Sequence, residues 1–326
     1  IHLHICLSLI FVFYRCLQLK FKKVDNQYLA ILSLVIFLSP SFRSLTIWPD
    51  SRIPGLIFFI TSILYFLKFL NEYKLKYAFF CTISIILSSY ISPNFSVFIL
   101  YFYYFFMKNM KINNLIYLLL FNFFLALPMI FYVFIMDVNF LIAGGTEQGG
   151  ERVVLRYNIS NKVLLISTIF LFHFLPFINS LLDISNIKKF AQKNLIIIIL
   201  PLIILIYFFD YSSQSTGGGF FYQLSNFLLG NNYLFYFFCF FSIILITYVS
   251  KLDYSNLFLM LLIFLSNVQN SIYHKYYEPM FFMMFFILFR NFEFDKFFKK
   301  YSNLYILYLF SFGFIILRIS KNYIVG

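Results

Sequence analysis

Charged residues are scarce in this sequence. They make up 11% of the 326 residues, against about a quarter in a soluble globular domain. Hydrophobic residues reach 62%, and the mean hydropathy is +0.87. Apolar runs long enough to cross a bilayer recur along the chain. The composition therefore excludes a soluble globule and predicts an all-α polytopic membrane protein, because only helices satisfy their own backbone groups in lipid.

Paired cysteines and soluble segments are also missing. The four cysteines have no paired spacing, and most lie in apolar runs, where cysteine behaves as a small apolar residue. We therefore expect no disulfide, no metal site and no cofactor. The net charge is +13, but no basic soluble domain exists to carry it to a nucleic acid, so nucleic-acid binding is not expected. We expect a single transmembrane domain over residues 1–326.

The apolar runs predict about twelve transmembrane helices. Some runs are short for the hydrocarbon core and are expected to extend into their flanks. The runs cover residues 1–14, 27–40, 54–71, 77–92, 94–107, 115–136, 162–181, 194–209, 232–250, 255–270, 278–290 and 303–319.

The connecting loops alternate between lysine-rich and lysine-poor. The positive-inside rule places the rich set in the cytoplasm and the poor set outside. The outer loops near 41–53, 137–161, 210–231 and 270–277 are polar or glycine-rich, and two of them are long. Because binding residues concentrate on such loops, we expect recognition and chemistry on the outer face, where the chain would meet membrane lipid and its substrates.

A polar island separates two apolar runs at 39–54. It contains Arg43, Arg52 and one carboxylate, Asp50. Arginine suits phosphate because its guanidinium is planar, always charged and a multiple donor. A carboxylate beside it can orient a sugar hydroxyl or act as a base, which makes Asp50 the candidate catalytic residue in the sequence. In the alternative interpretation the arginines only mark the membrane interface, with Trp48 in the aromatic belt.

A second polar cluster precedes the apolar run at 278–290. It comprises His274, Lys275, Tyr277 and Glu278, with Pro279 at the start of the expected helix. Lys275 suits a lipid phosphate. In the alternative interpretation, Glu278 is an acid at a helix start, where the helix dipole favours it.

The glycine-rich loop at 137–161 is a third candidate, with Glu151 and Arg152. It is either a substrate-binding segment or, slightly favoured, a solvated connector. The triple glycine at 217–219 is not a phosphate loop, because the following Lys-Ser/Thr is missing. His173 lies within an apolar run, where a polar contact between helices is the simplest interpretation.

The order and spacing of several short motifs resemble a known family. The motifs follow one another in this order: a basic turn, an apolar run ending in Ser-Pro, an arginine, an aspartate and a further apolar run. Later turns of the chain also match the family's motifs. The chain in this respect resembles the bacterial glycosyltransferases related to the protein O-mannosyltransferases, which have the GT-C membrane fold. The residues that carry the resemblance are Ser39, Pro40, Arg43, Asp50, Ile91-Ser92-Pro93-Asn94, Ala126-Leu127-Pro128, Tyr132 and Lys275-Tyr276-Tyr277-Glu278-Pro279.

The resemblance implies transfer of a hexose or pentose from a polyprenyl-phosphate sugar to a lipid, glycan or protein acceptor. The implied setting is the bacterial inner membrane, with the site facing outward. The family places its catalytic carboxylate in the first outer loop, so we expect that loop and the first span to lie upstream of Ile1. The named residues would then support catalysis, with Arg43 or Lys275 stabilising the departing phosphate.

Two other functions are compatible with the sequence. An O-antigen polymerase or ligase also has about twelve spans and large outer loops with arginines, but usually one dominant loop. A transporter or lipid flippase would show a repeat of two halves and polar residues at mid-depth, and neither is visible.

Overall fold

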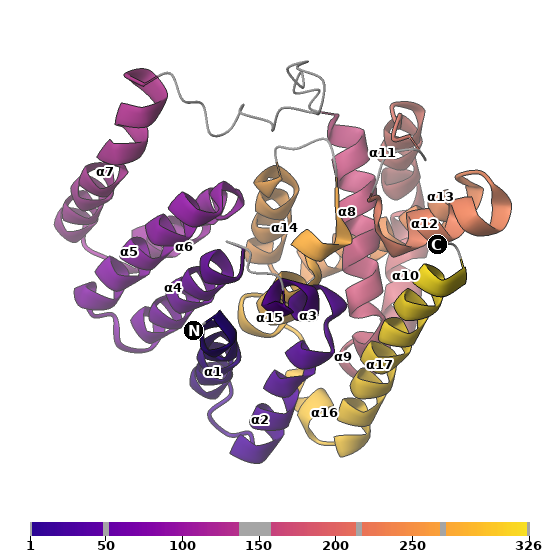
Figure 1. Cartoon of the computed structure of the whole chain (residues 1–326), viewed down its shortest axis with the longest axis horizontal. Helices are drawn as coiled ribbons and strands as arrows, with labels where there is room; N and C mark the ends of the chain where they lie inside the picture. The colour runs from indigo at the N-terminus through magenta and orange to yellow at the C-terminus, as the bar shows by residue number, and fades with distance from the viewer. Residues whose placement is uncertain (1, 48–51, 137–157, 213–216, 268–271, 325–326) are drawn as a thin grey trace. The chain divides into compact units, whose positions relative to one another are not determined.

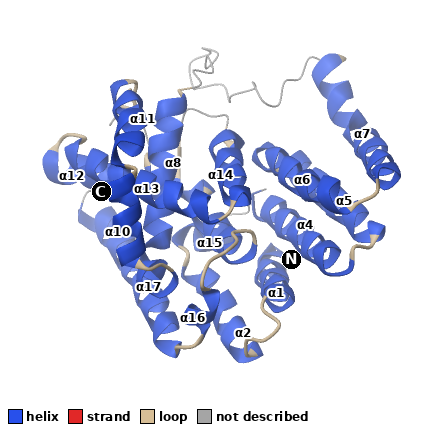
Figure 2. Ribbon diagram, turned by 180° about the vertical axis from the view of Figure 1, so that it is seen from behind, coloured by secondary structure: helices blue, strands red, loops and turns tan. Residues whose placement is uncertain are grey.

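The computed structural model describes residues 2–47, 52–136, 158–212, 217–267 and 272–324. Within these ranges the chain forms helices joined by loops, without a strand (Figure 2). Each apolar run expected from the sequence contains a helix. Asp50, Glu151 and Arg152 lie outside the described residues.

Several of the helices are suited to crossing a membrane. Many of their apolar side chains are exposed, such as Phe124 at 64% and Ile196 at 80%, so these surfaces need an apolar solvent. The chain is therefore a helical integral membrane protein. The number of about twelve spans stays a prediction. Five helices are long and apolar enough to span, namely Arg52–Glu72, Ile112–Tyr132, Ile159–Leu181, Tyr233–Leu252 and Tyr301–Ser320.

Two bent helix pairs bring the number of candidate spans to seven if each pair is one span. The pair Asn26–Leu38 and Pro40–Ile47 bends by 69°, and Ile184–Lys193 and Leu195–Tyr207 bend by 77°. None of the side chains of Ile184–Lys193 is buried. The apolar residues of this helix recur at helical spacing, and its lysines lie between and after them. Such a helix suits the membrane–water interface.

The chain divides into two compact units. The first comprises Ile1–Lys23, Leu45–Tyr157 and Leu265–Gln269. In Figure 1, α4 and α5 of this unit lie side by side. Its helices are α1 (His2–Lys20), α4 (Arg52–Glu72), α5 (Leu75–Ile91), η2 (Pro93–Phe98), α6 (Ile99–Asn109) and α7 (Ile112–Phe134).

Small residues bring α4 against the end of α5. The Ser88 hydroxyl donates a hydrogen bond to the Gly55 carbonyl at 2.7 Å. A Cβ on Gly55 would lie 2.7 Å from the Ser92 Oγ, so a larger residue there would force one of the two side chains to shift. Close approach at small residues is the usual way in which membrane helices pack, since lipid removes the hydrophobic driving force between them.

The second unit comprises Val24–Ser44, Asn158–Phe264 and Asn270–Gly326. Helix α3 begins in it and α14 ends at its boundary. Its elements are α2 (Asn26–Leu34), η1 (Val35–Leu38), α3 (Pro40–Ile47), α8 (Ile159–Phe174), η3 (Leu175–Phe177), α9 (Ile178–Leu181), α10 (Ile184–Lys193), α11 (Leu195–Tyr207), α12 (Gly219–Leu229), α13 (Tyr233–Leu252), α14 (Tyr254–Ser266), η4 (His274–Tyr276), α15 (Glu278–Ile287), α16 (Phe294–Phe298) and α17 (Tyr301–Ile324).

The core of the second unit is aromatic. Helix α8 packs against α13 and α15, and α17 contacts η1 and η3 (Figure 1). The Phe285 ring lies 4.9 Å from the Phe174 ring and 5.1 Å from the Phe177 ring, between centroids. Such ring pairs contribute about 0.5–1.5 kcal/mol each beyond the area that they bury. The contacts of α17 with η1, which directly precedes α3, place α17 next to the start of α3.

Helix α12 occupies part of an expected outer loop, and three consecutive glycines lead into it, the last of which is its first residue. Gly217, Gly218 and Gly219 all have positive φ, and Gly218 caps the helix in the left-handed conformation. The Gly218 N–H donates to the Ile272 carbonyl at 2.7 Å, which joins α12 to the segment before η4. The glycines therefore serve backbone geometry, since other residues avoid these φ values.

We predict that Gly218→Ala lowers the thermal stability of the detergent-solubilised protein by about 2 kcal/mol or more. The alanine would be strained at φ +83°, and its Cβ would lie 2.2 Å from the Tyr222 Cδ1. Gly313→Ala on α17 is the control, because a Cβ there meets nothing within 4 Å. That variant should be neutral or gain up to about 1 kcal/mol. Equal melting temperatures for the two variants would contradict the prediction.

Candidate functional site

Two of the polar clusters singled out in the sequence meet in the second unit. Glu278 begins α15, and only 4% of it is exposed. Its carboxylate accepts a hydrogen bond from the Ser41 N–H at 3.3 Å and another from the Ser41 hydroxyl. Ser41 lies in the first turn of α3, so the carboxylate is at the positive end of that helix. The island at 39–54 and the cluster at 274–279 thus share one buried polar contact.

Arg318 of α17 completes this contact. Its Nη1 lies 3.7 Å from the Glu278 Oε2 and 3.5 Å from the Ser41 Oγ. Arg318 is within a candidate membrane span, where ionisable side chains usually pair with one another. The guanidinium therefore supplies the opposite charge that a buried carboxylate requires.

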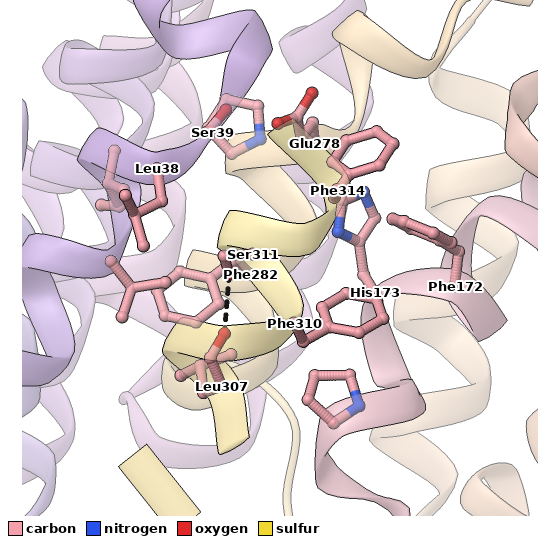
Figure 3. A pocket seen from close by; sticks show the side chains of 14 residues that line it. Leu38, Ser39, Phe172, His173, Glu278, Phe282, Leu307, Phe310, Ser311 and Phe314 are labelled. Carbon is pink, nitrogen blue, oxygen red and sulfur yellow. Dashed lines mark hydrogen bonds between the residues drawn. The ribbon is translucent and has the colours of Figure 1, made fainter. Parts of the chain in front are cut away.

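A small cavity lies next to the Glu278 carboxylate. Its volume is about 50 Å³, which admits water molecules but not a sugar. Figure 3 shows Glu278 near Ser39, with His173 and the rings of Phe310 and Phe314 further along the wall. The small cavity therefore belongs to the surroundings of the Glu278 contact and is not a pocket for a sugar.

A larger cavity, of about 350 Å³, opens beside it. This volume falls within the range of small-molecule pockets, roughly 300–1,000 Å³. The lining combines two cations with aromatic rings and the glycine segment before α12. The lining residues are Gly217, Gly219, Phe220, Gln223, Tyr273, His274, Lys275, Phe314, Leu317 and Arg318.

The two cations of the larger cavity differ in how their charge is matched. Arg318 faces the Glu278 carboxylate. The Lys275 ammonium lies 4.9 Å from the centroid of the Tyr273 ring and 5.9 Å from that of Tyr276. Among the described residues, Lys275 forms no ion pair with a carboxylate. The cavity therefore has excess positive charge and suits an anionic group.

His274 lies among aromatic rings on the wall of the same cavity. Its ring centroid is 5.2 Å from that of Phe172, 5.3 Å from Phe314 and 4.8 Å from His173. The side chain as a whole is partly exposed, but both ring nitrogens are buried and have no hydrogen-bond partner among the described residues. Burial, and then the neighbouring His173 and Arg318, lower the pKa of His274 well below its usual value, so the imidazole is neutral at physiological pH.

The remaining described sequence candidates line neither cavity. Arg43 is exposed on α3 and lines neither cavity. Arg52 begins α4 in the first unit. Tyr277 is buried and stacks on Phe281 at 5.2 Å, in the core rather than in a cavity. Of the described candidates, His274 and Lys275 line the larger cavity and Glu278 lines the smaller one.

Sequence reasoning missed two members of the site, Ser41 and Arg318. Ser41 lies in the island at 39–54, but a serine there has no feature in the sequence that distinguishes it from its polar neighbours. Arg318 did carry a signal, since it is a lone arginine near the end of an apolar run, and an ionisable residue in a membrane span usually has a partner.

Compared with known proteins, the chain matches no family model, no curated protein and no solved structure. The geometry of the second unit is therefore the basis for a functional proposal.

We predict that Ser41→Ala destabilises the protein by about 1–3 kcal/mol, because it removes a hydroxyl donor from a buried carboxylate. Ser311→Ala is the matched control. The Ser311 hydroxyl bonds only within its own helix, to the Leu307 carbonyl at 2.9 Å, so its loss should cost less than about 0.5 kcal/mol. Thermal unfolding in detergent measures both.

Glu278→Gln should make the Ser41 substitution less costly. The two side chains touch, so their effects are coupled and the double variant should lose less than the sum of the single losses. Strict additivity would show that the Ser41–Glu278 contact contributes nothing to stability.

Proposed function

We propose that the chain is an integral membrane glycosyltransferase that takes a sugar from a polyprenyl-phosphate donor. The acceptor is a lipid, glycan or protein hydroxyl. The proposal joins the resemblance of the sequence motifs to one observation, the placement of Lys275 and Arg318 on the wall of a cavity of about 350 Å³.

The lining of the larger cavity supports an anionic lipid as its ligand. Lys275 and Arg318 offer positive charge to a phosphate, and arginine can contact it through two donors. Phe220, Phe314 and Leu317 offer apolar surface to the carbon chain or the sugar faces. Helix α17, which carries part of the cavity wall, is a candidate membrane span, so the cavity borders a helix that would contact lipid.

The chemistry proposed is a direct displacement at the anomeric carbon. The acceptor oxygen loses its proton to a base and bonds to the anomeric carbon, while the bond from that carbon to the phosphate oxygen breaks. The phosphate leaves with the electron pair. Lys275 and Arg318 stabilise the charge that develops on it, which is a contribution that preorganised cations make in a low-dielectric site.

No described residue is assigned as the base. Glu278 is engaged by Ser41 and Arg318 and serves a structural purpose. Asp50 stays a sequence candidate for the base and lies outside the described residues. The GT-C arrangement, about twelve spans and a bacterial inner membrane with the cavity facing outward belong to the same proposal.

We predict that Lys275→Ala weakens binding of polyprenyl phosphate about 10- to 100-fold, which corresponds to the loss of one charge-assisted contact of about 1.5–3 kcal/mol. The measurement is a titration of the protein in lipid nanodiscs with polyprenyl phosphate. Lys251→Ala is the matched control, because Lys251 also lies over an aromatic ring, at 5.2 Å from the Phe190 centroid, yet lines neither cavity.

Two further results bear on the proposal. The uncharged alcohol, polyprenol, should bind much more weakly than polyprenyl phosphate, and equal binding of the two would contradict an anion site. In membranes that contain acceptor, Lys275→Ala should also slow the release of polyprenyl phosphate from polyprenyl-phosphate mannose, glucose or arabinose. If the unmodified protein releases it from none of the three, the transferase function is wrong.

A further inference from the structure

We propose that the His274 wall of the larger cavity binds the uncharged sugar ring of the donor, separately from the phosphate at Lys275 and Arg318. This inference rests on the proposed function and names the part of the substrate that each wall recognises. It also assigns a function to the His274 imidazole, which takes no part in the displacement chemistry.

The unpaired ring nitrogens of His274 are evidence for a ligand. Neither ring nitrogen has a protein partner among the described residues, although both are buried. A buried donor or acceptor without a partner costs free energy, so a ligand that pairs with it gains affinity. A neutral imidazole has one donor and one acceptor, and each hydroxyl of a sugar can fill either position.

The neutral His274 and the charged Lys275 distinguish the two walls of the cavity. The histidine is kept neutral by its burial and by His173 and Arg318, and therefore adds no charge for a phosphate. Lys275 follows directly in sequence but packs over Tyr273 and Tyr276, whereas His274 packs against Phe172 and Phe314. Two consecutive residues thus present a charged group and a neutral one to different neighbours.

The rings around His274 complete a surface suited to a sugar. Phe220 and Phe314 line the cavity together with His274. Phe172 lies behind them, 4.8 Å from the Phe220 ring and 4.7 Å from the Phe314 ring. Aromatic faces pack against the apolar C–H faces of a pyranose or furanose, while the imidazole edge pairs with its hydroxyls.

The test is to measure binding of bare polyprenyl phosphate and of polyprenyl-phosphate mannose, glucose and arabinose in nanodiscs. The unmodified protein should bind at least one sugar-bearing lipid more tightly than the bare phosphate. His274→Phe removes both nitrogens and keeps an aromatic ring. It should abolish that preference, an effect of about tenfold, and change binding of polyprenyl phosphate by less than about twofold.

Two variants control for a structural effect. His274→Gln restores a donor and an acceptor and should recover part of the preference for the sugar-bearing lipid. His4→Phe changes an exposed histidine in the first unit and should leave all four affinities unchanged.

The outcomes separate this inference from the proposed function. If Lys275→Ala weakens polyprenyl phosphate but His274→Phe weakens bare and sugar-bearing lipids equally, the sugar wall is wrong and the phosphate site stands. The same holds if no lipid of the panel binds more tightly than the bare phosphate. If Lys275→Ala changes no affinity, the phosphate site itself is wrong.

Discussion

A carboxylate buried in an apolar protein needs donors and an opposite charge, and the second unit is arranged around that requirement at Glu278. Its donors come from the first turn of α3 and its cation from α17. Leaving such a charge unpaired would cost several kcal/mol, so the three elements are held in one arrangement. Arg318 also lines the larger cavity, which means that the same contact positions the cavity wall.

Much of the fold could be predicted from the apolar runs, since a helix is the only way to satisfy backbone groups in lipid without a closed barrel. Each run contains a helix. The breaks were harder to predict. The 69° bend before Pro40 and the helix α12 inside an expected loop depend on a proline, a serine cap and positive φ at Gly218, which periodicity does not report.

The site was predictable in part. Lys275, His274 and Glu278 stood out because polar residues are rare in this sequence. The partners of Glu278 did not, because Ser41 is separated from it by 237 positions and Arg318 from Ser41 by 277. Only tertiary packing decides that a serine meets the carboxylate while Arg43, two residues later, is exposed.

The hydrogen bond from Gly218 to Ile272 joins the two sides of the larger cavity through backbone atoms alone. The shape of that cavity is thereby separated from its chemistry. The cavity-lining side chains of His274 and Lys275 take no part in that backbone bond. A scaffold of this kind leaves the chemistry of the cavity lining to its side chains, while a backbone bond joins its walls.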